Sequence, residues 1–179
     1  MSSVRQADFR DFSYPFSKNF LVSVPNRLRW MTLPERAKVT LKNGRYVFDS
    51  DGCHGLPGKC PLLALDTIQY GKFLGIPHET AVVEMTYHTG GTATWQYLYI
   101  LTVESGKPRV IAWLESGSRA DQGLTKVQID RGDLLLEVND PEKRQGDCCS
   151  TGFIRYRFRW YDASFRKVGN PVFGDYPQR

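Results

Sequence analysis

Apolar and polar residues alternate with a period of two along much of this sequence, and this alternation restricts the fold more than any other feature. In the run "ETAVVEMTYH", one face carries Ala81, Val83, Met85 and Tyr87, and the other carries Val82, Glu84, Thr86 and His88. Because successive side chains of a strand point to opposite faces, the run predicts a strand with one buried and one wet face. No stretch of ten or more residues has the period of a helix. The sequence therefore predicts an all-β fold.

The run "WQYLYILTV" differs, because both of its faces are apolar. One face carries Trp95, Tyr97, Tyr99 and Leu101, and the opposite face includes Leu98 and Ile100. A strand that is apolar on both sides has to be covered on both sides. We therefore expect residues 95–103 to form a central strand.

Turn-forming residues separate these runs, so we expect a mainly antiparallel meander of roughly eight to ten strands. A sheet of that length curls, or folds over into a β-sandwich or a barrel-like form. We expect a single domain over residues 1–179 with the meander core at 37–169. The segment 1–36 is expected to be irregular and to pack on that core, because proline fixes φ and removes a backbone donor at Pro15, Pro25 and Pro34.

Two turns are readable from short motifs. Asn43-Gly44 lies between two β-prone runs in "AKVTLKNGRYVF", which predicts a hairpin. The tripeptide Arg131-Gly132-Asp133 resembles an adhesion ligand, but it also lies between two apolar runs. A turn between strands explains it without a partner.

The four cysteines are confined to "CHGLPGKC" and an adjacent pair. A loop of six residues can bring Cys53 and Cys60 within disulfide range, and Cys148 can bond Cys149 or a cysteine of the first loop. Free thiols and a zinc site that includes His54 are the alternatives, although neither pair has zinc-ligand spacing. We expect disulfides, which persist in oxidising compartments.

The run "FIRYRFRWY" is the most basic strand. Period two places Ile154, Tyr156, Phe158 and Trp160 on the inner face and Arg155, Arg157 and Arg159 on the outer face. The arginines are candidate partner-binding residues, or they pair with carboxylates such as Glu84 or Glu137 across the sheet. Nucleic-acid readers usually expose stacking rings, whereas these rings point inward.

The polar loop "SRADQG" supplies two more candidates for partner binding. Arg119 and Asp121 bind a partner or pair with each other.

Catalysis has little support in the sequence. No metalloprotease, nucleophile-elbow or P-loop motif occurs, and we predict no cofactor and no metal. A Cys149–His88 nucleophilic pair can be drawn, but cross-linked cysteines are expected to be inert. Two carboxylate pairs can also be drawn, Glu79 with Glu84 and Asp121 with Asp133, and nineteen acidic residues make such pairs frequent by chance.

Two resemblances to known families add to this. The turn before Glu79 and the strand start Ala81–Val83 resemble the FG-GAP/VCBS β-repeat, in which an aspartate-rich turn binds calcium. Lys72, Leu74 and Ile76 occupy the places of the oxygen ligands, so we expect no calcium here.

The second resemblance is broader. "YG…G…ETAVV" (70–83), "TGGTATW" (89–95), "SGSRADQGL" (116–124) and the "CC" run (148–160) are similar to an uncharacterised family of small bacterial exported β-rich proteins and lipoproteins. The likeness covers about residues 40–165, and it implies a β-rich extracytoplasmic domain whose paired cysteines belong to a cross-linked loop cap.

These observations predict a non-catalytic, exported domain, periplasmic or extracellular, whose leader is missing from "MSSVRQADFRDF". No apolar run is long enough for a membrane span, and the net charge of +5 is modest. We expect the partner to be a protein or envelope component, with an inhibitor or immunity protein as one form. The alternative is an envelope hydrolase that uses His88 or a carboxylate pair in a sheet-lined cleft.

Overall fold

The computed structural model describes residues 3–17, 28–31, 37–48, 53 and 60–177. These residues form antiparallel strands and three short 3-10 turns, η1 (Val4–Gln6), η2 (Phe9–Asp11) and η4 (Pro141–Lys143). No helix of seven or more residues occurs in this part of the chain. The prediction of an all-β fold is confirmed.

The larger sheet has six strands in the order β2-β8-β7-β6-β5-β4. Its strands are β2 (Arg29–Met31), β4 (Arg45–Val47), β5 (Leu62–Gly71), β6 (Thr80–His88), β7 (Thr94–Glu104) and β8 (Lys107–Glu115). From β4 to β8 every strand pairs with the next one along the chain, which is the expected meander.

The smaller sheet contains β9 (Leu124–Asp130), β10 (Asp133–Asn139), β13 (Gly152–Tyr161), β14 (Ser164–Lys167) and β15 (Val172–Asp175). β14 pairs with one half of β13 and β15 pairs with the other half. Two ladders of two strands complete the described structure, β1 (Ser13–Pro15) with β3 (Lys38–Thr40), and β11 (Arg144–Gln145) with β12 (Cys149–Ser150).

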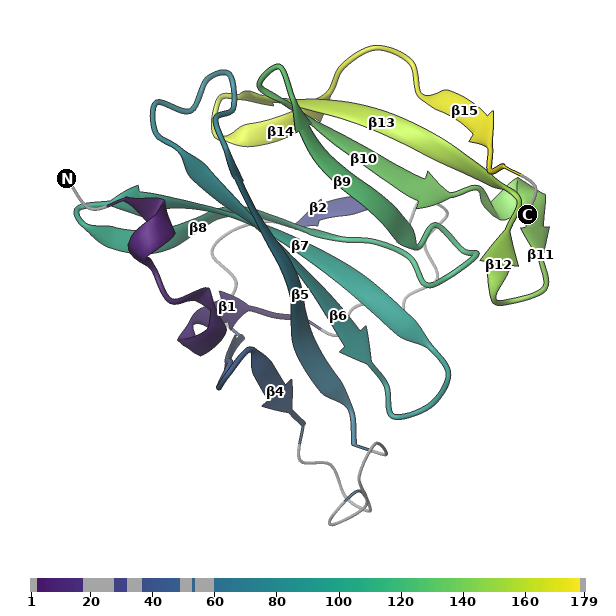
Figure 1. Cartoon of the computed structure of the whole chain (residues 1–179), viewed down its shortest axis with the longest axis horizontal. Helices are drawn as coiled ribbons and strands as arrows, with labels where there is room; N and C mark the ends of the chain where they lie inside the picture. The colour runs from purple at the N-terminus through teal and green to yellow at the C-terminus, as the bar shows by residue number, and fades with distance from the viewer. Residues whose placement is uncertain (1–2, 18–27, 32–36, 49–52, 54–59, 178–179) are drawn as a thin grey trace.

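The two larger sheets pack face to face, and none of the described sheets closes into a barrel (Figure 1). Between them lies a largely aliphatic core with Val82, Leu98, Ile100 and Leu114 from the larger sheet, and Leu134, Leu136, Ile154 and Phe158 from the smaller one. The face of β6 with Val82, Glu84, Thr86 and His88 was expected to be solvent-exposed, and this is wrong in part. Val82 is fully buried there, because the smaller sheet covers that end of the strand.

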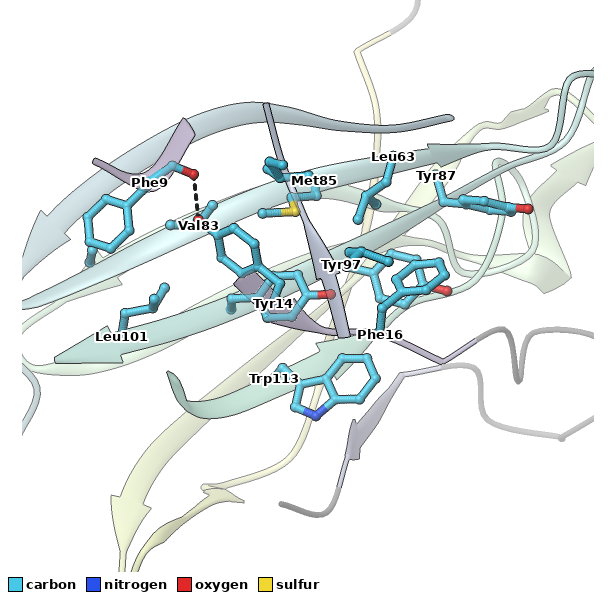
Figure 2. Packing of buried hydrophobic residues seen from close by; sticks show 14 of the residues in the cluster. Phe9, Tyr14, Phe16, Leu63, Val83, Met85, Tyr87, Tyr97, Leu101 and Trp113 are labelled. Atoms are coloured by element: carbon cyan, nitrogen blue, oxygen red, sulfur yellow. Dashed lines mark hydrogen bonds between the residues drawn. The ribbon is translucent and has the colours of Figure 1, made fainter. Parts of the chain in front are cut away.

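Residues 3–17 cover the opposite face of the larger sheet (Figure 1). Tyr14 packs there against Tyr99, and the Tyr99 ring is stacked on Trp113. Phe9 belongs to the same second, more aromatic core, and Figure 2 shows Phe9, Tyr14 and Trp113 within it. The Tyr14 hydroxyl donates a hydrogen bond of 2.8 Å to the Phe9 carbonyl, which satisfies a buried polar group. The molecule thus has three layers, with the larger sheet in the middle.

β7 is the central strand that its sequence predicts. Tyr97, Tyr99 and Leu101 face the aromatic core, and Leu98 and Ile100 face the aliphatic core; all five side chains are fully buried.

The expected hairpin at Asn43-Gly44 is wrong in part. The turn itself exists, because both residues have positive φ and Lys42 and Arg45 exchange backbone hydrogen bonds. The flanking runs then diverge, since β3 pairs with β1 and β4 pairs with β5. Pairing with distant strands outweighs the local ladder here.

Candidate functional site

The arginine row of β13 lies on the outer face of the smaller sheet, as its period of two predicts. Ile154, Tyr156 and Phe158 are buried in the aliphatic core. The outward side chains of Arg155, Arg157 and Arg159 are 39%, 36% and 33% exposed. We call the outer surface formed by Arg155, Arg157, Arg159, Tyr161 and Val172 the arginine face.

Asp133 holds two of these arginines. Its carboxylate accepts two hydrogen bonds from Arg159, at 2.7 and 2.8 Å, and one of 3.0 Å from Arg157. Arg157 also donates to Asp130 at 2.8 Å. The Asp133 side chain is only 1% exposed, so a buried anion fixes two guanidiniums at the surface.

Arg155 is held separately. Its Nε donates a hydrogen bond of 2.8 Å to Glu137, the residue directly opposite on β10. Its guanidinium also lies 5.1 Å from the centre of the Phe153 ring, within the range of a cation–π contact.

These contacts shift the acid–base properties of the site. The hydrogen bonds from Arg159, together with the one from Arg157, hold the pKa of the Asp133 carboxyl below its usual value, against the opposing effect of burial. The hydrogen bond to Asp130 is the main cause that raises the pKa of Arg157. Both shifts favour the charged form, so the pKa changes stabilise the Asp133 carboxylate and the Arg157 guanidinium as an ion pair.

The sequence indicated only part of this network. Glu137 was expected as a partner and is one, whereas Glu84 accepts hydrogen bonds from Thr67 and Gln69 instead. Asp130 and Asp133 were missed, although they flank the Arg131-Gly132 turn. That turn is confirmed by positive φ at both central residues.

Arg119 and Asp121 lie in the loop that joins β8 to β9. Ser118 and Asp121 exchange backbone hydrogen bonds, and the Arg119 carbonyl accepts from Gly123 N and from the Asn139 amide. Asp133 begins β10 just after the turn that ends β9, so β9 separates this loop from the Asp133 cluster.

The cysteines form two local disulfides, Cys53–Cys60 and Cys148–Cys149, so the alternative in which one of the adjacent cysteines reaches the first loop is not realised. The first bond closes the loop before β5. The second lies in the short hairpin of β11 and β12.

The pairs drawn for catalysis are not brought together as catalytic groups. The sulfur of Cys149 is bonded to Cys148, so it is no free nucleophile for His88. Glu79 forms a bidentate pair with Arg5, whose hydrogen bond lowers the pKa of Glu79. Asp121 and Asp133 lie at opposite ends of β9.

Two adjoining recesses open between the sheets, of about 380 and 590 Å³. They share Arg109, Ile111 and Trp160, and the smaller one is also lined by His78 and Glu104. Glu104 forms an ion pair with Arg109. Across the described residues, no three His, Cys, Asp or Glu side chains gather as a metal site requires.

A comparison of the chain with protein-family models, curated proteins and solved structures finds no match in any of the three. The resemblances noted from the sequence stay predictions. None of the described segments is a helix long and apolar enough to cross a membrane.

Proposed function

We propose that this protein is a non-catalytic domain that recognises another protein through the arginine face. The observation that carries the proposal is the row of three partly exposed guanidiniums whose carboxylate partners hold them in place from within the sheet.

A fixed row of arginines suits binding, because little side-chain entropy remains to be lost when a partner arrives. Two exposed apolar side chains extend the same face. Tyr161 follows the arginine alternation and is 45% exposed, and Val172 is opposite Arg155 and is 54% exposed. Arginine and tyrosine are enriched in protein–protein interfaces.

Charge balance favours a protein over a nucleic acid. Binding to phosphates depends on uncompensated cations that release counterions. Here Asp130, Asp133 and Glu137 offset Arg155, Arg157 and Arg159. The face therefore offers oriented donors and ring surface rather than a strong positive field.

An exported location and an inhibitor or immunity role are parts of the same proposal. Two disulfides favour an oxidising compartment. The alternative, an envelope hydrolase, has weaker support, because the recess between the sheets contains neither His88 nor a carboxylate pair.

The test is site-specific photo-crosslinking in the envelope and secreted fractions of the source organism. A photoreactive residue at position 161 should capture a protein at a one-to-one ratio. The same residue at Val47, which is 57% exposed on edge strand β4 of the other sheet, should not.

The captured protein is then purified and its affinity is measured by calorimetry. Tyr161→Ala combined with Val172→Ala should weaken binding by about tenfold or more, whereas Val47→Ala should leave it unchanged. Raising the salt from about 50 to about 200 mM should change the affinity far less than the 10³–10⁵-fold typical of phosphate binding. Equal capture at both positions, or a salt dependence of that size, would refute the proposal.

A further inference from the structure

The Cys148–Cys149 disulfide lies in the tight hairpin of β11 and β12, which directly precedes β13, and neither cysteine belongs to the arginine face. Both cysteines are exposed, and Cys149 lines an open recess with Ser150, Asp175 and Tyr176. We propose that this disulfide is a reversible thiol-exchange site for dithiols, whereas Cys53–Cys60 is structural. Cross-linked cysteines were expected to be inert, and the geometry points to the opposite for this pair.

Adjacency in the sequence makes the bond easy to reduce. The two Cα atoms are 3.7 Å apart, whereas disulfides usually join Cα atoms 4.4–6.8 Å apart. Neighbouring residues cannot reach that range, because consecutive Cα atoms are fixed by the peptide unit. A disulfide outside its preferred geometry is more reducible.

Solvent exposure also favours reduction of Cys148–Cys149 over Cys53–Cys60. An attacking thiolate has to reach a sulfur atom. Cys148 and Cys149 are both exposed, whereas Cys53 is 6% exposed and its sulfur lies near the Phe48 carbonyl. External thiols therefore meet the adjacent pair first.

The fold does not depend on the adjacent pair. A disulfide restricts the unfolded chain less as the closed loop shortens, and this loop is the shortest possible. The hairpin is also anchored by other bonds. Ser150 Oγ lies 2.8 Å from the carbonyls of Asp140 and Gly152, and Thr151 N donates to the Lys143 carbonyl. Reduction can therefore proceed without unfolding the domain.

The exchange balances as follows. A thiolate of the dithiol attacks one cysteine sulfur, a mixed disulfide forms, and the Cys148–Cys149 bond breaks. The other cysteine leaves as a thiolate and takes up a proton. The second thiol of the dithiol loses its proton and displaces the first cysteine, so the dithiol is oxidised to a disulfide and the pair is reduced by two electrons.

The test uses dithiothreitol on the full chain under native conditions, with alkylation and mass spectrometry at intervals. Cys148 and Cys149 should become alkylated about tenfold or more faster than Cys53 and Cys60, and oxidised glutathione should restore the bond once the dithiothreitol is removed. A Cys53→Ala/Cys60→Ala variant should leave the rate at the adjacent pair unchanged. Far-UV circular dichroism of the reduced protein should stay native.

A second variant tests adjacency itself. One glycine inserted between Cys148 and Cys149 keeps the cysteines exposed but relaxes the ring, and it should slow reduction about tenfold. Equal reduction rates for the two native disulfides, or no effect of the insertion in a variant with a native spectrum, would overturn the proposal.

Discussion

Asp133 is the residue on which the arginine face depends. It is a nearly buried carboxylate, and it accepts three hydrogen bonds from two arginines that remain partly exposed. A buried anion with good partners stabilises a fold modestly, but its partners lose their orientation when it is removed. Asp133 thus links the stability of the smaller sheet to the shape of its outer surface.

Asp133→Asn should lower the free energy of unfolding by about 1–3 kcal/mol, because the amide cannot accept all three charge-assisted bonds. Urea unfolding at neutral pH measures the change. Asp162→Asn is the matched control. Asp162 also faces an arginine, Arg166, at 3.6 Å, but it is 88% exposed, so its loss should be nearly neutral. Equal effects of the two variants would contradict this role for Asp133.

The stability that Asp133 contributes to the native chain should depend on pH. The folded-state pKa of Asp133 is lowered, so its stabilising contribution is complete above the unfolded pKa of about 3.9 and is lost as the pH falls through the lowered folded value. The stability gap between the native chain and Asp133→Asn should therefore shrink when urea unfolding is repeated near about pH 3. A gap that is constant with pH would show that the carboxylate is not the cause.

At the scale of elements, the loop of residues 116–124 is tightly closed. Gly117 N donates to the Gln122 carbonyl at 3.1 Å, and Gly123 N donates to the Arg119 carbonyl at 2.9 Å. A Cβ on Gly117 would overlap the carbonyl of Asp121, so only glycine fits at that position.

Gly117→Ala should therefore destabilise the protein by about 1–3 kcal/mol, as overpacking does. Gly91→Ala is the control, since a Cβ there meets only Thr89 Oγ1 at an ordinary 3.6 Å, and its effect should stay within about 0.5 kcal/mol. Thermal unfolding of both variants measures the difference. A Gly117→Ala protein as stable as Gly91→Ala would show that the loop can open to admit the methyl group.

Sequence reasoning succeeds where the determinants of an element are local. Alternation identified β6, β7 and the inward rings of β13, and short motifs identified the turn at Arg131-Gly132. At Asn43-Gly44 it found the turn but not the strand pairing, because the partners of β3 and β4 lie elsewhere in the chain. Two anchors of the arginine face, Asp130 and Asp133, were missed for the same reason. They meet Arg157 and Arg159 only through the pairing of β10 with β13, which a long connection separates in the chain.

At the scale of the whole molecule, residues 3–17 of the N-terminal segment form a layer of the fold. Its described residues have no strand-like period, so the sequence predicted packing but no particular contacts. Tyr14 is fully buried, its ring centre lies 4.9 Å from that of Tyr99, and its hydroxyl is bonded to the Phe9 carbonyl. The aromatic core is thus built jointly by the N-terminal segment and by β7 of the larger sheet.

Tyr14→Ala should lower the stability of the entire chain by about 3–5 kcal/mol, as the loss of a buried ring does. Ser13→Ala, in the same strand but exposed, should cost far less. Trp113 and Trp160 lie in different cores, so fluorescence and circular dichroism together follow both. A single shifted transition is expected, and a separate early transition with the main one unmoved would mean that the segment is only an appendage.

The hydroxyl groups of β7 have a consequence for how the chain selects its alignment. A register shift by one residue exchanges the two faces of a strand. When both faces are apolar, the hydrophobic pattern does little to disfavour that shift. Such a slip would carry Tyr97 and Tyr99 into the aliphatic side. Their hydroxyls would lose the carbonyls of Ser17 and Pro15, to which they now donate at 3.2 and 2.8 Å. The two buried hydroxyls therefore select one register. In the shifted register they would lose their hydrogen-bond acceptors, a cost that the burial of apolar surface alone would not impose.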